Sequence, residues 1–414
     1  MVVADTKKEV VKELLKKYKD TKKSEVIDMN KVIITEKYPI KLWLDDIEDG
    51  ALQQARDLAN LPFVHKWVSL MADSHQGYGM PIGGVLATNG VVIPNAVGVD
   101  IGCGMCAVKT SLKSDEININ EIKEIMGSVR EDIPVGFNHH KEPQKWEGFA
   151  NTPHTPFIQN LIESASYQLG TLGGGNHFIE IQKGTFGFIW FMIHSGSRNF
   201  GYKIANEFHN IAVDLCRKWY SDIPNKDLSF LPIGTQEGRD YFNTMNFALS
   251  FAKENRKQMA DKVKANFSKV FKKIKFVDTI DVHHNYANWE NHYGKNVIVH
   301  RKGAISAREG EVGIIPGSQG TKSYIVKGLG NPESFDSCSH GAGRRMSRSK
   351  ACKELSLKDE IKKLDDQGIV HGIRHTSDLD EASGAYKDIN VVMENQKDLI
   401  SIETELTPLA VIKG

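Results

Sequence analysis

The stretch PNAVGVDIGCGMC, residues 94–106, combines a glycine-rich segment with two side chains that can bind a metal, Asp100 and Cys103. Its valines and isoleucine alternate with other residues, which predicts a short buried strand. A buried carboxylate is costly unless it is paired or bound to a metal. The stretch therefore either anchors a metal site, or forms a buried turn in which Asp100 caps backbone amides and Cys103 packs as a small apolar residue.

Four histidines downstream favour the metal site. Each lies at the end of an apolar strand or in a glycine-rich turn, and they are His177 in GGGNHFIE, His194 in MIHSGSR, His284 in DVHHNYA and His340 in CSHGAGRR. A single histidine of this kind is usually a core residue. Four of them, together with Asp100 and Cys103, indicate that these side chains converge at one edge of the fold, because strand ends commonly carry functional sites.

Composition and charge are those of an ordinary globular protein. The chain has 414 residues, of which 40% are hydrophobic and 25% charged, and its formal net charge is +1. This balance gives no global basic excess, so a nucleic-acid partner must be recognised by a local patch. Five scattered cysteines do not resemble a secreted disulfide framework. With no signal peptide and no apolar run long enough to span a membrane, we expect a soluble, cytoplasmic protein.

Periodicity predicts an α+β protein. Apolar residues at helical spacing predict helices over residues 7–19, 45–59, 118–129, 157–169, 200–220 and 239–273. Strands are expected after residue 64, around 178 and 190, repeatedly from 276, and in the terminal LAVIKG, while Asn89-Gly90 predicts a two-residue β-hairpin. Residues 72–84 and the segment with His139, His140 and His154 are expected to be loops, the latter exposed.

These elements predict one interwoven domain over residues 1–414, with a helical N-terminal part (1–62) and a catalytic core (63–414). We expect glycine-rich turns at strand ends to line one active-site cleft, with the long amphipathic helices outside. The chain contains no internal repeat or low-complexity linker that would divide it.

Two short motifs have weaker interpretations. CGMC, residues 103–106, matches the C-x-x-C of zinc and redox sites, but it lacks a second cysteine pair and does not begin a predicted helix, so Cys106 is expected to be a packing residue. PGSQGTKS, residues 316–323, does not have the spacing of a Walker A loop. A local basic set instead predicts a polyanionic substrate, and it comprises Arg198, Arg301, Lys302, Arg344, Arg345, Arg348 and Lys350.

Nine motifs in order resemble the RtcB RNA ligases: VGVDIGCGM, LGGGNHFIEI, HSGSR, HHN, HRKGA, PGSQGTKSY, SHGAGRRMSR, EASGAYKD and VIKG. The resemblance covers the chain from about residue 70 onward and implies the α+β fold of that family. It also implies an enzyme that uses GTP and two manganese ions to join an RNA 3′-phosphate or 2′,3′-cyclic phosphate to a 5′-hydroxyl end, in tRNA splicing or RNA repair.

The resemblance assigns roles to residues at matching positions. His340 is expected to be the nucleophile that accepts GMP. The expected metal ligands are Asp100, Cys103, His177, His194 and His284. The expected nucleotide contacts are Asn176, Phe178, Glu180, Asn285, Ser318, Ser323, Gly341, Ala342, Gly343, Tyr386 and Lys413. From the basic set, the expected RNA contacts are Arg198, Lys302, Arg344 and Arg348.

Several alternatives stay open at this point. Ligand type alone favours zinc, and manganese enters through the resemblance. His283 competes with His284 as the ligand, and His284 is preferred because it precedes Asn285, as in the H-N of the family. A metal-dependent phosphoesterase or a non-ligating RNA-binding paralogue are the competing functions, although neither needs His340 as a nucleophile. A monomer is expected, and archease is the activating partner that the resemblance suggests.

Overall fold

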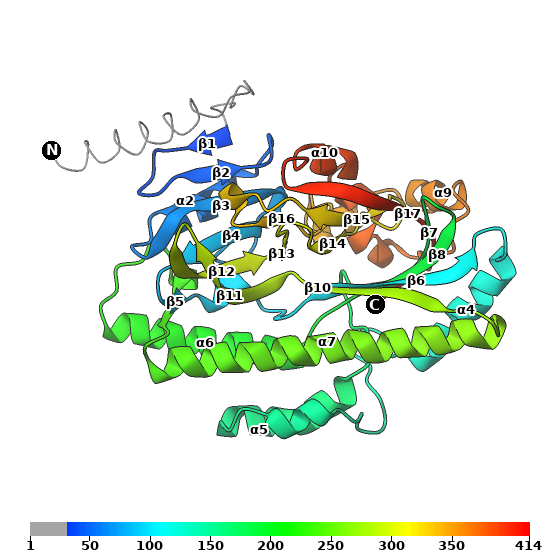
Figure 1. The fold of residues 1–414 in the computed structure, drawn as a ribbon, viewed down its shortest axis with the longest axis horizontal. Helices are drawn as coiled ribbons and strands as arrows, with labels where there is room; N and C mark the ends of the chain where they lie inside the picture. Colours follow the sequence, from blue (N-terminus) through cyan, green and yellow to red (C-terminus); the bar gives the residue numbers. More distant parts are fainter. Residues whose placement is uncertain (1–30) are drawn as a thin grey trace.

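The computed structural model describes residues 31–414, which form two twisted sheets side by side above a layer of helices (Figure 1). The predicted helix over residues 7–19 lies outside the described residues. The six-stranded sheet has the order β1 (Val32–Ile33), β2 (Ile40–Leu42), β3 (Val64–His75), β4 (Ile82–Thr88), β12 (Lys295–Lys302) and β11 (Asn285–His292). The seven-stranded sheet has the order β10 (Phe276–His283), β6 (Gly104–Lys113), β8 (Phe188–Ser195), β7 (Phe178–Gly184), β17 (Ile400–Lys413), β15 (Ser323–Gly328) and β14 (Val312–Ile315).

Two short strand pairs and nine helices complete the described fold. β5 (Val91–Val92) pairs with β9 (Leu231–Pro232), and β13 (Ala304–Ser306) pairs with β16 (Ser337–Ser339). The α-helices are α2 (Asp49–Ala59), α3 (Pro94–Val97), α4 (Ile119–Asp132), α5 (Pro156–Gln168), α6 (Arg198–Lys218), α7 (Gln236–Val270), α8 (Arg348–Glu354), α9 (Leu357–Asp365) and α10 (Ile389–Glu394). No helix within residues 31–414 combines the length and apolarity needed to cross a membrane.

The two sheets meet at the chain segment between β10 and β11. β10 is an edge strand of the seven-stranded sheet, β11 is an edge strand of the six-stranded sheet, and only His284 lies between them. Since adjacent residues of a strand point to opposite faces, a histidine at this position can face the space between the two sheets. The fold thus places one of the predicted ligands at the junction.

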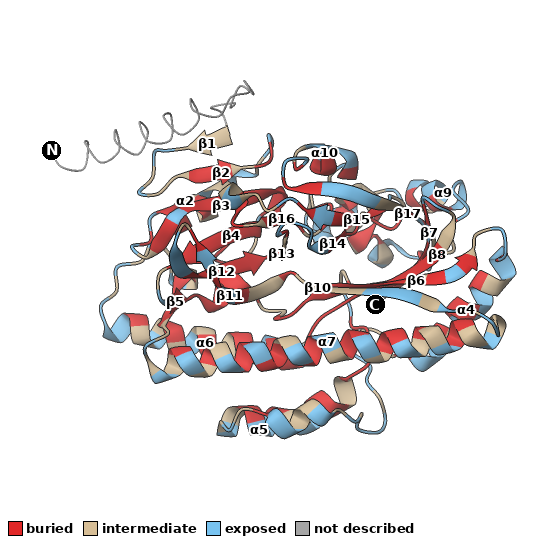
Figure 2. Ribbon diagram, viewed as in Figure 1, coloured by how far each residue is buried: buried red, intermediate tan, exposed pale blue. Residues whose placement is uncertain are grey.

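Helix α7 runs along one side of both sheets, with α6 beside it (Figure 1), and buried and exposed residues alternate along both helices (Figure 2). In α6, Phe200, Ile204 and Phe208 are buried at helical spacing. In α7, Phe267 stacks on Phe191 of β8 with ring centroids 5.9 Å apart, inside the core between this helix and the seven-stranded sheet. Helix α7 therefore supports the sheet from which most of the predicted ligands extend.

Residues 94–106 do not form the predicted short strand. Pro94 starts α3, because its fixed φ suits the first turn of a helix, and the chain then passes through a loop before β6. Gly98 and Gly102 have φ values of 99° and 73°, a conformation that side chains with a Cβ rarely adopt, so these glycines end the helix and turn the chain.

Three other expectations are corrected. Asn89-Gly90 turns the chain, but β4 pairs with β3 and β12 while β5 pairs with β9, so no hairpin forms. β3 continues through Asp73 to His75, where a loop was predicted, and its buried residues explain the continuation. The helix expected from residue 45 begins at Asp49, and residues 31–62 also contain β1 and β2, so this part is not only helical. The single α+β domain itself is confirmed.

Candidate active site

Five side chains of the ligand types converge where the two sheets meet, and we call them the ligand cluster. Asp100 and Cys103 lie in the loop before β6, His177 precedes β7, His194 is near the end of β8, and His284 separates β10 from β11. All except Asp100 are buried. Strand ends thus bring together residues that lie up to 184 positions apart in the sequence.

Cys103 is the centre of the ligand cluster. Its Sγ lies 3.3 Å from Nε2 of His194 and 3.5 Å from Nε2 of His177. His194 Nε2 is also 3.4 Å from Nε2 of His284, and His177 Nε2 is 3.1 Å from Oδ2 of Asp100. The five residues therefore form two groups of three, one with His194 and His284 and one with Asp100 and His177, which share Cys103.

The hydrogen bonds of the histidines direct their lone pairs toward Cys103. Nδ1 of His177 donates to the carbonyl of Leu172 at 2.8 Å, and Nδ1 of His194 donates to the carbonyl of Asn176 at 3.0 Å. Each Nε2 is then an acceptor, which is the tautomer found in metal-bound histidines. Within the ligand cluster, Asp100 Oδ1 and His284 Nδ1 are buried without a hydrogen-bond partner among the described residues. Acceptors that face one another in this way fit a bound cation.

The protonation of the ligand cluster also fits a cation. Burial lowers the pKa of His194 and of His284 well below the usual range, so both imidazoles are neutral at pH 7. Burial, followed by the charge of Asp100, raises the pKa of the Cys103 thiol well above its usual range. A thiolate at this position requires a compensating positive charge, which a divalent ion provides.

The contacts of the two side chains show which of His283 and His284 can be a metal ligand. Nδ1 of His283 lies 3.2 Å from the carbonyl oxygen of Gly102 and 3.2 Å from Nη2 of Arg256, and His283 belongs to neither group of possible metal ligands among the described residues. His284 instead contacts His194, and its ring centroid is 4.6 Å from that of His340. The structure therefore brings His284, and not His283, into the site.

His340 lies next to the ligand cluster and is held by Asp73, which sequence reasoning did not assign. The Nδ1–H of His340 donates to Oδ2 of Asp73 at 2.7 Å, and the backbone amides of His340 and Gly341 donate to the same oxygen at 3.2 Å. Burial alone would raise the pKa of Asp73, but the contact with His340 outweighs it and lowers that pKa. Nε2 of His340 is left with a free lone pair. The signal for Asp73 was its place in a strand-end ADSH segment, which was interpreted as a loop.

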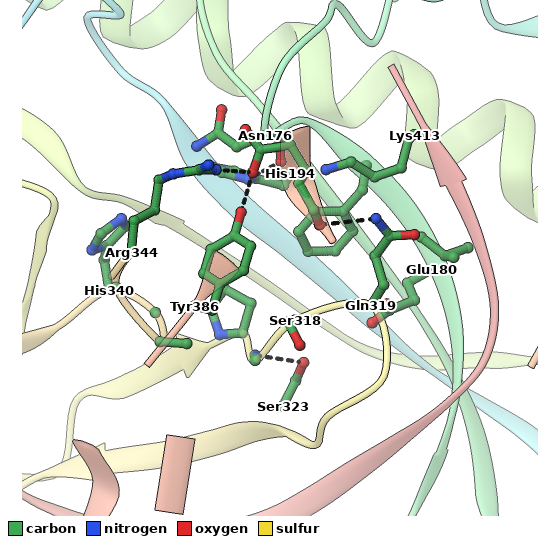
Figure 3. Close-up of a pocket in the computed structure, with 18 of the residues that line it drawn as sticks. Asn176, Glu180, His194, Ser318, Gln319, Ser323, His340, Arg344, Tyr386 and Lys413 are labelled. Atoms are coloured by element: carbon green, nitrogen blue, oxygen red, sulfur yellow. Dashed lines mark hydrogen bonds and ion pairs between the residues drawn. The ribbon is translucent and has the colours of Figure 1, made fainter. Parts of the chain in front are cut away.

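An inner pocket of about 170 Å³ opens beside His340 (Figure 3). Ten of the eleven predicted nucleotide contacts line it, namely Asn176, Phe178, Glu180, Ser318, Ser323, Gly341, Ala342, Gly343, Tyr386 and Lys413. Asn285 is the exception: its side chain donates to the carbonyl of Asp100 at 3.1 Å and accepts from the amide of Gly303 at 2.9 Å. Asn285 therefore supports the loop of the ligand cluster and does not line the inner pocket.

Glu180 and Lys413 lie on the side of the inner pocket opposite His340 and Arg344 (Figure 3). Burial raises the pKa of Glu180 to about 8, against the opposing hydrogen bond from Gln182. Burial likewise lowers the pKa of Lys413. A buried carboxyl with a raised pKa, in a pocket, is typical of a group that binds or reacts with a ligand.

Two of the four predicted RNA contacts form a group with Glu381 and Tyr386, which we call the glutamate cluster. Arg344 donates from Nη1 to Glu381 at 2.7 Å and from Nη2 to the carbonyl of Asp380 at 2.7 Å. Arg348 donates from Nε to Glu381 at 2.7 Å, and Tyr386 also bonds this carboxylate. Most donors of Arg344 are therefore used within the protein, whereas the side chain of Arg348 is 54% exposed.

The other two predicted RNA contacts are also held by the protein. Arg198 donates to Thr171 Oγ1 at 3.2 Å and to the carbonyl of Gly136 at 3.0 Å. Lys302 is buried, and its Nζ donates to the carbonyl of Asn95 at 2.9 Å. Burial lowers the pKa of Lys302 to about 7. The ammonium group of Lys302 is therefore not exposed to solvent, whereas an RNA contact in a basic surface patch would be exposed.

An outer hollow of about 660 Å³ also borders His340. Asp100, Cys103 and His284 line it, together with the exposed Tyr78. His340 borders both the inner pocket and the outer hollow. A group that reacts at His340 can thus be approached from two separate spaces.

Comparisons with known proteins agree with this geometry. Residues 54–414 match the family described as tRNA-splicing ligase RtcB. The RNA-splicing ligase RtcB of Escherichia coli K12 is 38% identical over 408 residues, which is 92% of this chain and 99% of the relative. The tRNA-splicing ligases RtcB of Thermococcus kodakarensis and Nanoarchaeum equitans are each 32% identical, covering 89% and 91% of this chain and 92% and 95% of their own lengths. The chain belongs to the RtcB family of RNA-splicing ligases.

Proposed function

We propose that this protein is a GTP-dependent RNA ligase that joins a 3′-phosphate or 2′,3′-cyclic phosphate end to a 5′-hydroxyl end, in tRNA splicing or RNA repair. The observation that carries the proposal is the position of His340, between the inner pocket and the outer hollow, with Nδ1 held by Asp73. GTP would occupy the inner pocket and the RNA ends the outer hollow.

In the first step, Nε2 of His340 attacks the α-phosphorus of GTP. An N–P bond forms, the bond from the α-phosphorus to the bridging oxygen breaks, and pyrophosphate leaves. The ring becomes positively charged during the attack, and the carboxylate of Asp73 stabilises that charge through Nδ1–H. Asp73 also fixes the tautomer in which Nε2 carries the lone pair.

In the second step, an oxygen of the RNA 3′-phosphate attacks the phosphorus bound to His340, and the N–P bond breaks to leave GMP on the RNA end. The 5′-hydroxyl of the other RNA end then attacks the 3′-phosphate, a phosphodiester forms, and GMP leaves. A 2′,3′-cyclic phosphate must first be opened by water to a 3′-phosphate. Each step replaces one bond to phosphorus by another.

The ligand cluster would hold two manganese ions, one at each of its two groups of three ligands, and Cys103 is a member of both groups. When bound, such ions neutralise phosphate oxygens and orient the reacting groups. The protein's own contribution is the fixed geometry of the ligand cluster, because two of its histidines are oriented by backbone carbonyls. The affinity order of divalent metals favours zinc at thiolate and imidazole ligands, so the choice of manganese rests on family membership.

Guanine recognition would rest on Glu180. The N1–H and 2-amino groups of guanine are adjacent donors, and an ionised carboxylate can accept both. Ser318 and Ser323 lie in the glycine-rich segment at the same pocket, and Lys413, which is half-buried, provides a positive charge near Glu180. Of the predicted RNA contacts, Arg348 is the one with an exposed guanidinium, and it lines both spaces.

The test is covalent labelling of the protein by GTP that carries label in the α-phosphate, in the presence of manganese. We expect an adduct that is labile in acid and stable in alkali, as a phosphoramidate is, and its loss in His340→Ala. The matched control is His371→Ala, because His371 is another buried histidine beside an aspartate, 3.2 Å from Asp365, and does not line the inner pocket.

Persistent labelling of His340→Ala would overturn the proposed nucleophile. The competing phosphoesterase function predicts a different result: cyclic phosphate ends would be opened without GTP, and no label would remain on the protein. A non-ligating RNA-binding paralogue would show neither labelling nor opening.

A further inference from the structure

A fully buried arginine, Arg256, lies in the middle of α7 behind the ligand cluster. Its Nε and Nη2 donate to the two carboxylate oxygens of Asp281 at 2.8 and 2.7 Å. Its Nη1 donates to the carbonyls of Gly102 and Ser195, both at 2.9 Å, and its Nη2 donates to Nδ1 of His283 at 3.2 Å. One guanidinium therefore connects α7 to three strand ends.

Three of the four residues that Arg256 contacts lie next to a residue of the ligand cluster. Gly102 precedes Cys103, Ser195 follows His194, and His283 precedes His284. These three ligands form one of the two metal-binding groups. Arg256 thus contacts the backbone before Cys103, the backbone after His194 and the side chain before His284.

We propose that Arg256 is the positioning residue of this metal group: by bonding the neighbours of Cys103, His194 and His284 at once, it sets the distances between the three ligands. The inference rests on the proposed function, because it assumes that the ligand cluster binds metal. Arg256 itself does not touch the metal or the substrate.

The chemistry of arginine suits this role. Guanidinium is a rigid planar fork, so it can bond a carboxylate on one side and carbonyl groups on another, whereas lysine offers a single compact charge. A buried charge needs a partner, and Asp281 provides it. The backbone also makes room for the arginine: a Cβ on Gly104 would lie 3.0 Å from Nη1 of Arg256 and 2.2 Å from the carbonyl oxygen of Val282.

The sequence DVHH, residues 281–284, fits the same arrangement. Asp281 and His283 are two residues apart in β10, so both side chains lie on the face that carries Arg256. His284 is turned to the opposite side, toward His194. The two adjacent histidines thus have separate roles: His283 contacts Arg256, and His284 belongs to the ligand cluster.

The experiment titrates cobalt(II) chloride into the metal-free protein and follows the charge-transfer absorption of a cobalt–thiolate bond. For Arg256→Lys we expect the affinity for cobalt to fall about 10- to 100-fold and the absorption of the loaded protein to change, because residues that orient metal ligands typically have effects of this size. Unfolding by urea is measured for the same protein.

Arg301→Lys is the matched control. Arg301 is also fully buried and bonds a carboxylate, Glu290, and the carbonyl of Phe335, but it has no contact with the ligand cluster. We expect Arg301→Lys to lose stability to urea while it keeps the cobalt affinity and spectrum of the wild type. An equal loss of cobalt affinity in both variants would assign the effect to general destabilisation and overturn the proposal.

If Arg256→Lys does not fold, Asp281→Asn tests the same positioning of the metal ligands. Asparagine has about the same volume as aspartate. It weakens the bidentate contact of Arg256, and we expect a smaller loss of cobalt affinity, about 10-fold. Wild-type affinity in a folded variant at either position overturns the inference and leaves the proposed function intact. Failure of the wild-type protein to bind cobalt or manganese would instead remove the proposed metal site itself.

Discussion

The ligand cluster and the glutamate cluster border the same spaces around His340, but their polar atoms are satisfied in opposite ways. In the ligand cluster, acceptors face one another, and Asp100 and His284 each have a buried atom without a partner among the described residues. In the glutamate cluster, the carboxylate of Glu381 bonds Arg344, Arg348 and Tyr386.

This difference separates two kinds of charged residue that look alike in a sequence. A cluster of acceptors without donors is arranged for a positive ion from outside the chain. A cluster in which arginines already bond a carboxylate stabilises the fold, and it offers a phosphate only the donors that remain. Proximity of a basic residue to a functional motif therefore does not establish that the residue is free to bind a substrate.

The largest effect is expected from Cys103→Ala, which removes the atom shared by the two metal groups. We expect loss of both ions, since each group would keep two ligands, and loss of RNA joining. Elemental analysis of protein equilibrated with manganese measures the bound metal.

His284→Ala is the comparison for Cys103→Ala, because it removes a ligand from one group only. We expect it to keep roughly half of the bound metal. If Cys103→Ala also kept half or more, the two groups would not share the thiolate, and the ligand cluster would be a single site.

The next effect concerns the aspartate behind the nucleophile. Asp73→Asn should slow the labelling of His340 by GTP about 10²- to 10⁴-fold, because the amide cannot stabilise a charged imidazole as the carboxylate does. Metal content should stay at the wild-type level, since Asp73 is not part of the ligand cluster. A labelling rate within threefold of the wild type would show that the contact between Asp73 and His340 is structural.

Within the glutamate cluster, two arginines should differ. Arg344→Ala should lower the free energy of unfolding by about 3 kcal/mol, because it leaves a buried carboxylate with fewer donors. Arg348→Ala should lower it by at most about 1 kcal/mol, because the side chain of Arg348 is 54% exposed. Urea denaturation measures both.

RNA binding should show the reverse order for the two arginines. Arg348→Ala should weaken RNA binding and reduce its salt dependence by about one unit, as expected for a lost phosphate contact. Labelling of His340 by GTP should stay nearly unchanged in this variant. A shallower salt dependence in Arg344→Ala, at unchanged stability, would return Arg344 to the RNA-binding role predicted from the sequence.

The smallest effect is a pH dependence that distinguishes two carboxyl groups of the inner pocket. Glu381 has a lowered pKa, since Lys413 and the two arginines outweigh burial, whereas burial raises the pKa of Glu180 to about 8. If Glu180 binds guanine as proposed, it does so in its ionised form, so binding of GTP should release one proton below pH 8.

The affinity for GTP should therefore rise by at most about tenfold per pH unit up to pH 8 and become constant above it. Isothermal titration in buffers of different ionisation enthalpy measures the released proton. Glu180→Gln should bind GTP more weakly at every pH and without this dependence. An affinity that does not change between pH 6.5 and pH 8 in the wild type would contradict the assignment of Glu180.

The sequence was sufficient to predict which types of residue form the site and where most helices and strands lie. Apolar periodicity located α6 and α7, and strand-end motifs located the five members of the ligand cluster. Local patterns failed where long-range pairing decides: Asn89-Gly90 has the composition of a hairpin turn, but its flanking strands pair with β3, β12 and β9. The segment from residue 94 became a helix because Pro94 begins it and Gly98 ends it.

Partners of individual polar groups were harder to predict. Asp73 could not be assigned to His340, because 266 residues separate them in the sequence. Arg344 and Lys302 looked like free cations, yet the carbonyl and carboxylate groups that bind them come from distant segments. The hydrogen-bond partners of a buried polar side chain depend on the packed fold. A motif therefore indicates which ligands a residue can bind, but not whether its donors and acceptors are already bonded within the protein.

The order of strands in the seven-stranded sheet affects how the protein is made. β17 lies between β7 and β15, yet it is synthesised long after β7. At ribosomal rates of 5 to 20 residues per second, the roughly 200 residues between these two strands take about 10 to 40 s. During that interval β7 has an unpaired edge, which is a site for association with other chains.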